Sequence, residues 1–128
     1  MNHDNITVEI VGGRLFRHSV VTVGAATLAW LSRYRPDLCF IGATGLHPDQ
    51  GITTGDSEEA EIKRFVISIS GAAYILASSE KIGAVSAFEV TEFNKIDGII
   101  ATAKSEKTVL AKLEHRGCRV ILADQKTA

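Results

Sequence analysis

The residues best suited to bind a small molecule lie in a glycine- and threonine-rich stretch between residues 40 and 64. An apolar run, residues 38–41, leads into a loop, and the loop opens a helical pattern with an acidic first turn. Glycines let the backbone approach a ligand, and the N-terminus of a helix favours anionic groups such as phosphate. The stretch therefore predicts one wall of a pocket for a small polar molecule. Its candidate residues are Gly42, Gly45, Thr53, Thr54, Glu58 and Glu61.

Two further segments carry candidate ligand-binding residues directly after apolar runs. Gly12, Gly13 and Arg14 follow the first run of the chain. Lys81 comes shortly after another run, which ends at Ala77. An arginine can hold a phosphate through two parallel hydrogen bonds, and a lysine can neutralise its charge. We therefore expect these residues to contribute to the same pocket.

Each candidate also has a simpler interpretation. The glycine pair can be a turn between strands, Arg14 can be a solvated side chain, and the threonines can be ordinary loop residues. Glu58 can merely complement the helix dipole, an effect of about 0.3–1 kcal/mol. Glu59 and Lys63 are spaced to form a surface salt bridge along the helix. The residue pattern leaves these alternatives open.

Strand-like and helix-like segments alternate along the chain, which favours a mostly parallel sheet covered on both faces. The predicted strands are residues 6–11, 20–23, 38–41, 74–77, 87–90, 99–101 and 118–122. The predicted helices are residues 24–34, a segment capped by Asp56 with a core stripe of Ile62, Phe65, Val66, Ile69, Ala72 and Ala73, and a last helix from Ser105 to a stop at Gly117. Trp30, Phe65 and Phe88 are predicted core residues.

The continuous apolar run at residues 38–41 is typical of a strand buried on both faces of a parallel sheet. Ligands of open α/β sheets bind beyond the carboxyl ends of the strands. Because the candidate residues follow predicted strands, we expect them to meet at one edge of the sheet. The residues predicted to line this single cleft are Gly12, Gly13, Gly42, Gly45 and Lys81.

Composition narrows the class of protein. The 128 residues are 45% hydrophobic, which is enough for a single core. The formal net charge is -1, without a cluster of Lys or Arg, so the chain itself is not expected to bind nucleic acid. Cys39 and Cys118 are expected to be buried, reduced thiols, and no metal site or cofactor is predicted. Neither a membrane span nor a signal peptide is evident, so we expect a cytoplasmic protein.

Six short segments follow one another in a fixed order along residues 6–102. They are Val11-Gly12-Gly13-Arg14 with Val23-Gly24, Asp37-x-x-Phe40-x-Gly42-x-x-Gly45, Gly51-Ile52-Thr53-Thr54, residues 58–64, residues 76–83 and residues 96–100. In this order they resemble the C-terminal effector-binding domain of the DeoR family of bacterial transcription repressors.

The resemblance implies a three-layer α/β fold, similar to ribose-5-phosphate isomerase and glucosamine-6-phosphate deaminase. It implies a sensor that binds a phosphorylated sugar, forms a homo-oligomer and controls operator DNA through a winged helix-turn-helix absent from this chain. The family's Gly-Thr-Thr phosphate loop would precede residue 1. Residues 1–128 are therefore expected to be a single, partial effector-sensing domain. Ser78 stands where the family often has Asp, and Ala101-Thr102 where many members have Thr-Asp, so the identity of the sugar is left open.

Two alternatives remain beside the sensor. An isomerase- or deaminase-like enzyme on the same fold would need a positioned base, and Glu58, Glu61 and Lys81 are the candidates for it. No His, Cys or Ser is visibly set up as a nucleophile–base pair, so we predict no catalytic residues. The other alternative is an oligomerisation domain with a vestigial pocket.

Overall fold

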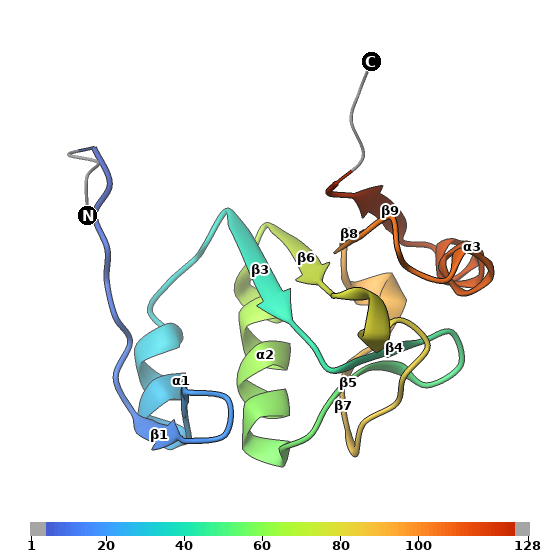
Figure 1. Cartoon of the computed structure of the whole chain (residues 1–128). Coiled ribbons are helices and arrows are strands. Elements are labelled where there is room, and N and C mark those ends of the chain that lie inside the picture. Colours follow the sequence, from blue (N-terminus) through green and yellow to red (C-terminus); the bar gives the residue numbers. More distant parts are fainter. Residues whose placement is uncertain (1–4, 125–128) are drawn as a thin grey trace.

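The computed structural model describes residues 5–124 and shows helices arranged around a parallel sheet (Figure 1). The strands are β1 (Arg14–Phe16), β2 (Val21–Val23), β3 (Leu38–Gly42), β4 (Gly45–His47), β5 (Gly51–Thr54), β6 (Ala72–Leu76), β7 (Phe88–Thr91), β8 (Gly98–Ala101) and β9 (Arg119–Leu122). The α-helices are α1 (Ala25–Leu31), α2 (Ser57–Ile69) and α3 (Lys107–His115), and short 3₁₀ turns occupy Ser79–Lys81 and Phe93–Lys95.

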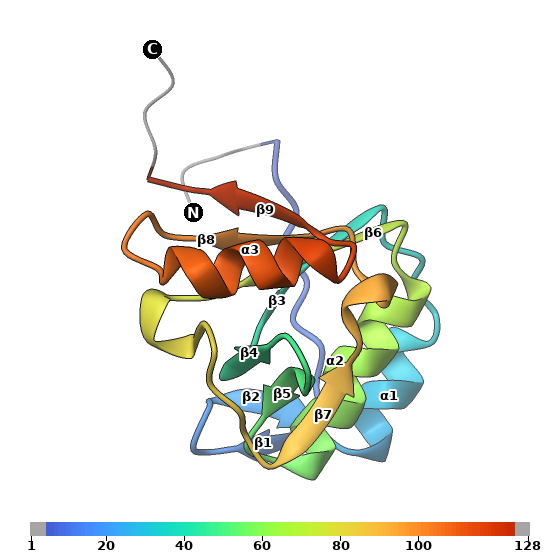
Figure 2. The same cartoon turned by 90° about the vertical axis from the view of Figure 1, so that its right-hand side faces the viewer.

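The main sheet has the strand order β3-β6-β8-β9, and every neighbouring pair is parallel. Ile41, Ile75, Ile99 and Val120 lie in one row across it. Figure 2 shows α3 lying along β8 and β9, and α1 and α2 side by side. The α/β class with a mostly parallel sheet is confirmed, and the arrangement is consistent with a three-layer α/β fold.

Two small antiparallel sheets accompany the main sheet. One has the order β4-β5-β7, and the other is the β1-β2 hairpin. The strand predicted at residues 6–11 is wrong for the described chain, because this extended segment pairs with no other strand. Its apolar side chains are exposed, with Ile10 90% accessible. Strand-like alternation alone therefore did not produce a strand, since pairing also requires a neighbouring edge.

Helix α2 begins where its cap predicts. The side chain of Asp56 accepts a hydrogen bond from the backbone N–H of Glu59 (2.9 Å). The helix ends at Ile69, so the predicted stripe was too long, and Ala72 and Ala73 belong to β6. The last helix ends as predicted, with Gly117 at a left-handed φ of 96° just beyond it.

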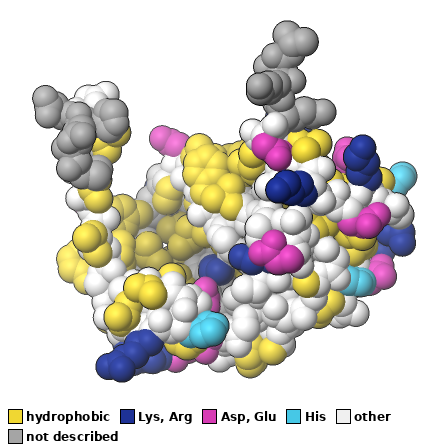
Figure 3. Space-filling model, viewed as in Figure 1, with side chains coloured by type: hydrophobic (Ala, Val, Ile, Leu, Met, Phe, Trp, Pro, Cys, Tyr) yellow, Lys and Arg dark blue, Asp and Glu magenta, His cyan; other side chains and the backbone are white. Residues whose placement is uncertain are grey.

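The outer face of the main sheet is only partly covered. Cys39 is buried, but its neighbours Leu38 and Phe40 are 48% and 55% exposed, so the prediction of burial on both faces was wrong. Successive strand side chains point to opposite faces, and here only one face is packed. Trp30 and Phe88 are also exposed rather than in the core. The space-filling view shows hydrophobic side chains around a hollow beside the N-terminal segment (Figure 3).

Both cysteines are free and buried, as predicted. Burial, with a further contribution from the Glu114 carboxylate, raises the pKa of the Cys118 thiol to about 11. The thiol is therefore protonated and inert at neutral pH. Among the described residues, no helix is long and apolar enough to cross a membrane.

Candidate functional site

A buried polar network lies along the N-terminal half of α2. Glu59 is only 6% exposed and pairs with Lys63 one turn further on (Oε1–Nζ 3.1 Å). The hydroxyl of Ser19 donates to the other oxygen of Glu59 (3.1 Å). The Lys63 ammonium also donates to the backbone carbonyl of Gly42 (2.6 Å). The network therefore joins the loop before β2 to the carboxyl end of β3.

This arrangement corrects the interpretation of Glu59 and Lys63 as a surface salt bridge. Their side chains are 7% and 16% exposed, so both charges are largely removed from water. A buried charge is tolerated only when it is paired and hydrogen-bonded. The pair therefore needs Ser19 and Gly42 as additional partners, and it fixes the end of β3 against α2.

A second, exposed ion pair lies next to the buried network. Arg14 of β1 pairs with Glu58 in the first turn of α2, and the two side chains are 59% and 46% exposed. Gly24 also lies close, because a side chain there would begin 3.7 Å from a carboxylate oxygen of Glu58. The guanidinium group is thus within reach of solvent and of any molecule that enters beside α2.

The two glycines of the predicted cleft near β1 have different surroundings. A Cβ atom at Gly13 would collide with the Thr27 hydroxyl, and that hydroxyl donates to the carbonyl of Gly12 (3.0 Å). Gly13 therefore permits the close packing of α1 on the turn. Nothing lies within 4 Å of the position that a Cβ would take at Gly12 or at Gly42, so both backbones border open space.

Gly45, Thr53 and Thr54 lie inside the small β4-β5-β7 sheet. Thr53 is 3% exposed, and its hydroxyl donates to the carbonyl of Gly45 (3.3 Å) and accepts from the backbone N–H of Ser86 (2.8 Å). Thr54 is 1% exposed. A side chain at Gly45 would begin 2.6 Å from the Thr53 hydroxyl. The Thr53 hydroxyl therefore ties Gly45 to Ser86 and directs no free donor outward.

Lys81 and Glu61 take no part in the hydrogen bonds and the ion pair of the network. Lys81 ends the 3₁₀ turn after β6, and Gly42 and Leu76, the last residues of β3 and β6, are paired in register. In the same turn the Ser78 hydroxyl donates to the Glu80 carboxylate (2.6 Å) and holds the pKa of Glu80 below its usual range. Glu61 is exposed on α2 and faces α1. Of the predicted residues, Arg14, Gly42 and Glu58 are therefore the ones adjoining the network.

Ser19, Glu59 and Lys63 are not among the binding residues predicted from the sequence. The spacing of Glu59 and Lys63 was the available signal, because it places both on one face of a helix that follows a glycine-rich loop. Burial of that face depends on β2 and β3, which are distant in sequence.

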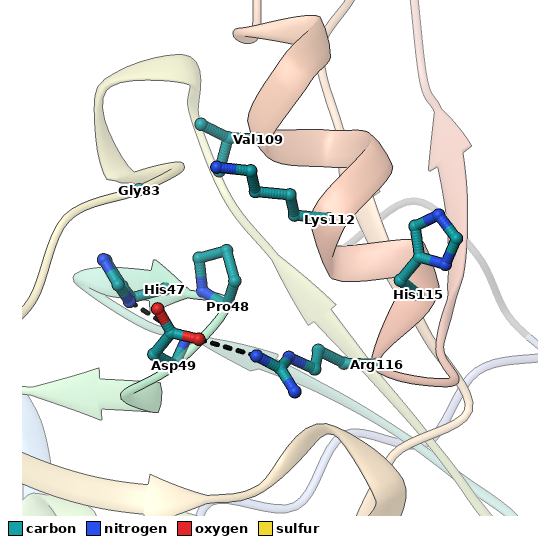
Figure 4. A pocket seen from close by; sticks show the side chains of 8 residues that line it. All are labelled: His47, Pro48, Asp49, Gly83, Val109, Lys112, His115 and Arg116. Atoms are coloured by element: carbon teal, nitrogen blue, oxygen red, sulfur yellow. Dashed lines mark hydrogen bonds and ion pairs between the residues drawn. The ribbon is translucent and has the colours of Figure 1, made fainter.

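A separate cavity of about 410 Å³ lies between α3 and the β4–β5 turn (Figure 4). Arg116 points to Asp49 and pairs with it (2.6 Å). His47 accepts a hydrogen bond at Nδ1 from the backbone N–H of Asp49 (3.0 Å). Lys112 also lines the cavity, whereas none of the predicted binding residues does. Its lining therefore combines two fixed positive charges with one carboxylate.

The comparisons with known proteins agree with the fold. The model of the DeoR C-terminal sensor domain matches residues 1–103. The chain is 26% identical over 122 residues to the HTH-type transcriptional repressor GlcR of Bacillus subtilis, covering 95% of this chain and 47% of that protein. It is 27% identical over 123 residues to the HTH-type transcriptional regulator GolR of Listeria innocua, covering 96% of this chain and 48% of that protein.

A third relative, the HTH-type transcriptional regulator FruR of Bacillus subtilis, is 35% identical over 81 residues, which are 63% of this chain and 32% of that protein. The chain thus spans about half the length of GlcR and GolR. It belongs to the DeoR C-terminal sensor domain family, whose members are sensor domains of transcription regulators rather than enzymes.

Proposed function

We propose that this chain is the ligand-sensing domain of a bacterial DeoR-type repressor and binds a phosphorylated sugar beside the N-terminal half of α2. The observation that carries the proposal is the Lys63 bridge between buried Glu59 and the carbonyl of Gly42. The bridge fixes the position of Gly42, whose backbone borders open space at the carboxyl end of a parallel strand. Ligands of open α/β sheets usually bind at this end of the strands.

In this proposal, Arg14 binds the phosphate and Glu58 accepts hydrogen bonds from sugar hydroxyls. Both side chains are accessible and adjacent. A guanidinium group forms paired hydrogen bonds with phosphate, so it can bind the ligand while keeping contact with its carboxylate. The open backbones of Gly12 and Gly42 give the ligand room, and Lys81 approaches from the end of β6.

The remaining predicted residues have other roles. Gly13 lets α1 pack on the turn, while Gly45, Thr53 and Thr54 maintain the loop after β3. Binding would change the position of β1 relative to α2, because Arg14 connects them. We expect this shift to favour one of two conformations of the repressor. The change would alter operator binding by a winged helix-turn-helix outside the chain, and it would take place in the cytoplasm.

Calorimetry with a panel of pentose and hexose phosphates tests the proposal. The repressor that carries this domain is expected to bind one of them with micromolar to millimolar affinity. Arg14→Gln should weaken binding roughly tenfold or more, because a charged hydrogen bond contributes about 1.5–3 kcal/mol.

Arg116→Gln is the matched control. Arg116 is also an exposed arginine paired with a carboxylate, but it lies at the α3 cavity. If the affinity for the sugar phosphate falls in Arg116→Gln and not in Arg14→Gln, the ligand binds in the α3 cavity instead. Conversion of ribose 5-phosphate to ribulose 5-phosphate by the full-length protein would instead support the hypothesis that it is an isomerase.

A further inference from the structure

The cavity between α3 and the β4–β5 turn combines a polar lining with the size of a small-molecule site. Its volume is about 410 Å³, within the range of about 300–1,000 Å³ that is usual for ligand pockets. His47, Lys112 and Arg116 contribute nitrogen atoms to its lining, and Pro48 and Val109 contribute apolar surface. None of these residues belongs to the network along α2, so the α3 cavity is a separate candidate site.

Positive charge is in excess in the α3 cavity. Lys112 and Arg116 are four residues apart at the end of α3, so their side chains leave the helix on the same side and repel each other. Asp49 pairs with Arg116 (2.6 Å). Within residues 5–124, the Lys112 ammonium forms no hydrogen bond or ion pair. One of the two cations is therefore left without a counter-charge.

The α3 cavity also offers hydrogen-bond donors whose directions are set by other contacts. His47 is half-buried and accepts the backbone N–H of Asp49 at Nδ1 (3.0 Å), so a neutral His47 ring carries its proton at Nε2. Arg116 is held by Asp49 through Nη2 and keeps further N–H donors. Figure 4 shows Lys112 extending from α3 toward the side of the cavity where Gly83 and His47 lie. Donors from three residues therefore line the same space.

The wall opposite α3 is held in place by the fold. The backbone N–H of Gly83 donates to the carbonyl of Leu46 (2.7 Å), and Leu46 also forms a parallel bridge with Ile82. Leu46 and Ile82 are buried. A site that is ordered before binding loses less conformational entropy when the ligand enters. Because His47 follows Leu46 in β4, its position is set before a ligand binds.

We propose that the α3 cavity binds a small phosphate-bearing anion, as a second ligand site of this domain. Lys112 neutralises the phosphate, and Arg116 and the Nε2–H of His47 donate hydrogen bonds to its oxygens. The oxygens of a phosphate point in tetrahedral directions, so it can accept from three residues at once, whereas one guanidinium group satisfies a planar carboxylate. Pro48 and Val109 suit the apolar part of a phosphate ester.

NMR of the isotope-labelled chain, titrated with inorganic phosphate at constant ionic strength, tests this site. The backbone amide signals of residues 47, 49, 83 and 109–116 are expected to shift and to saturate, because the ligand lies between these segments. Lys112→Gln should weaken the phosphate affinity read from these signals roughly fivefold or more, since it removes a charged hydrogen bond. Lys107→Gln is the matched control, because Lys107 is an exposed lysine of the same helix that does not line the cavity.

Further variants separate this site from the proposed sugar-phosphate site. Arg14→Gln is expected to leave the signals of the α3 cavity unchanged even where it abolishes binding of the sugar phosphate, so failure of one site leaves the other testable. Circular dichroism shows whether Lys112→Gln is folded. If it is not, His47→Ala replaces it and should also weaken phosphate binding. Lys112→Arg keeps the charge and should retain most of the affinity.

The choice of anion distinguishes the remaining cases. Tighter binding of methyl phosphate than of inorganic phosphate would assign the α3 cavity to a phosphate ester, and the reverse would assign it to the free ion. Equal binding of succinate would overturn the proposal, because the cavity would then accept planar carboxylates as well. Unchanged affinity in Lys112→Gln would also overturn it, as would shifts that do not saturate and that NaCl produces equally.

Discussion

Two sides of helix α2 each carry a glutamate and a basic residue, yet the surroundings of these side chains differ. On one side Glu59 and Lys63 are buried and paired, and Ser19 and Gly42 complete their hydrogen bonds. On the other side Glu61 is exposed without a partner in the described chain, and Arg64 is turned to β7. The first side connects elements of the fold, whereas the second leaves bonding capacity for another molecule. Charge alone therefore does not determine whether a side chain supports the fold or is free to bind another molecule.

The largest effect should come from removing the buried carboxylate. Glu59→Ala leaves the Lys63 ammonium with only the Gly42 carbonyl as partner, so we expect the free energy of unfolding to fall by about 3 kcal/mol. Urea denaturation measures the change. Glu61→Ala is the matched control on the exposed side and should change stability by less than about 0.5 kcal/mol. Equal losses of stability in Glu59→Ala and Glu61→Ala would contradict the view that only the buried carboxylate supports the fold.

A smaller effect is expected at the start of α2, which both sides share. Asp56→Ala removes the hydrogen bond from the N–H of Glu59 to the Asp56 carboxylate, at a cost of about 1 kcal/mol. Urea denaturation again measures the loss. Asp56→Asn keeps an N-cap acceptor and should recover most of it. If Asn does not recover stability, the negative charge rather than the hydrogen bond is what matters at this position.

The smallest effect should come from the exposed ion pair beside the buried network. Arg14→Ala is expected to lower the free energy of unfolding by less than about 1 kcal/mol, because solvent screens the pair. The difference should disappear in denaturation experiments at about 1 M NaCl, where the Debye length is about 3 Å. A loss that persists in high salt would mean that Arg14 stabilises the fold through packing instead.

Several elements could be predicted because their signals are local. The Asp56 cap, the Gly117 stop and the apolar strands of the main sheet depend on residues that are neighbours in the sequence. Burial was predicted less well. Leu38 and Phe40 are as apolar as the core, but the sheet face that they occupy is exposed in this chain.

The sequence by itself determined the alternation of helices and strands and the family. These follow from backbone conformation and from the spacing of apolar residues, which act over a few positions. Only the tertiary structure decided that Glu59 and Lys63 are buried, that Thr53 and Thr54 face inward and that Glu61 has no partner in the described chain. The physical reason is that desolvation of a side chain depends on which distant segments pack against it.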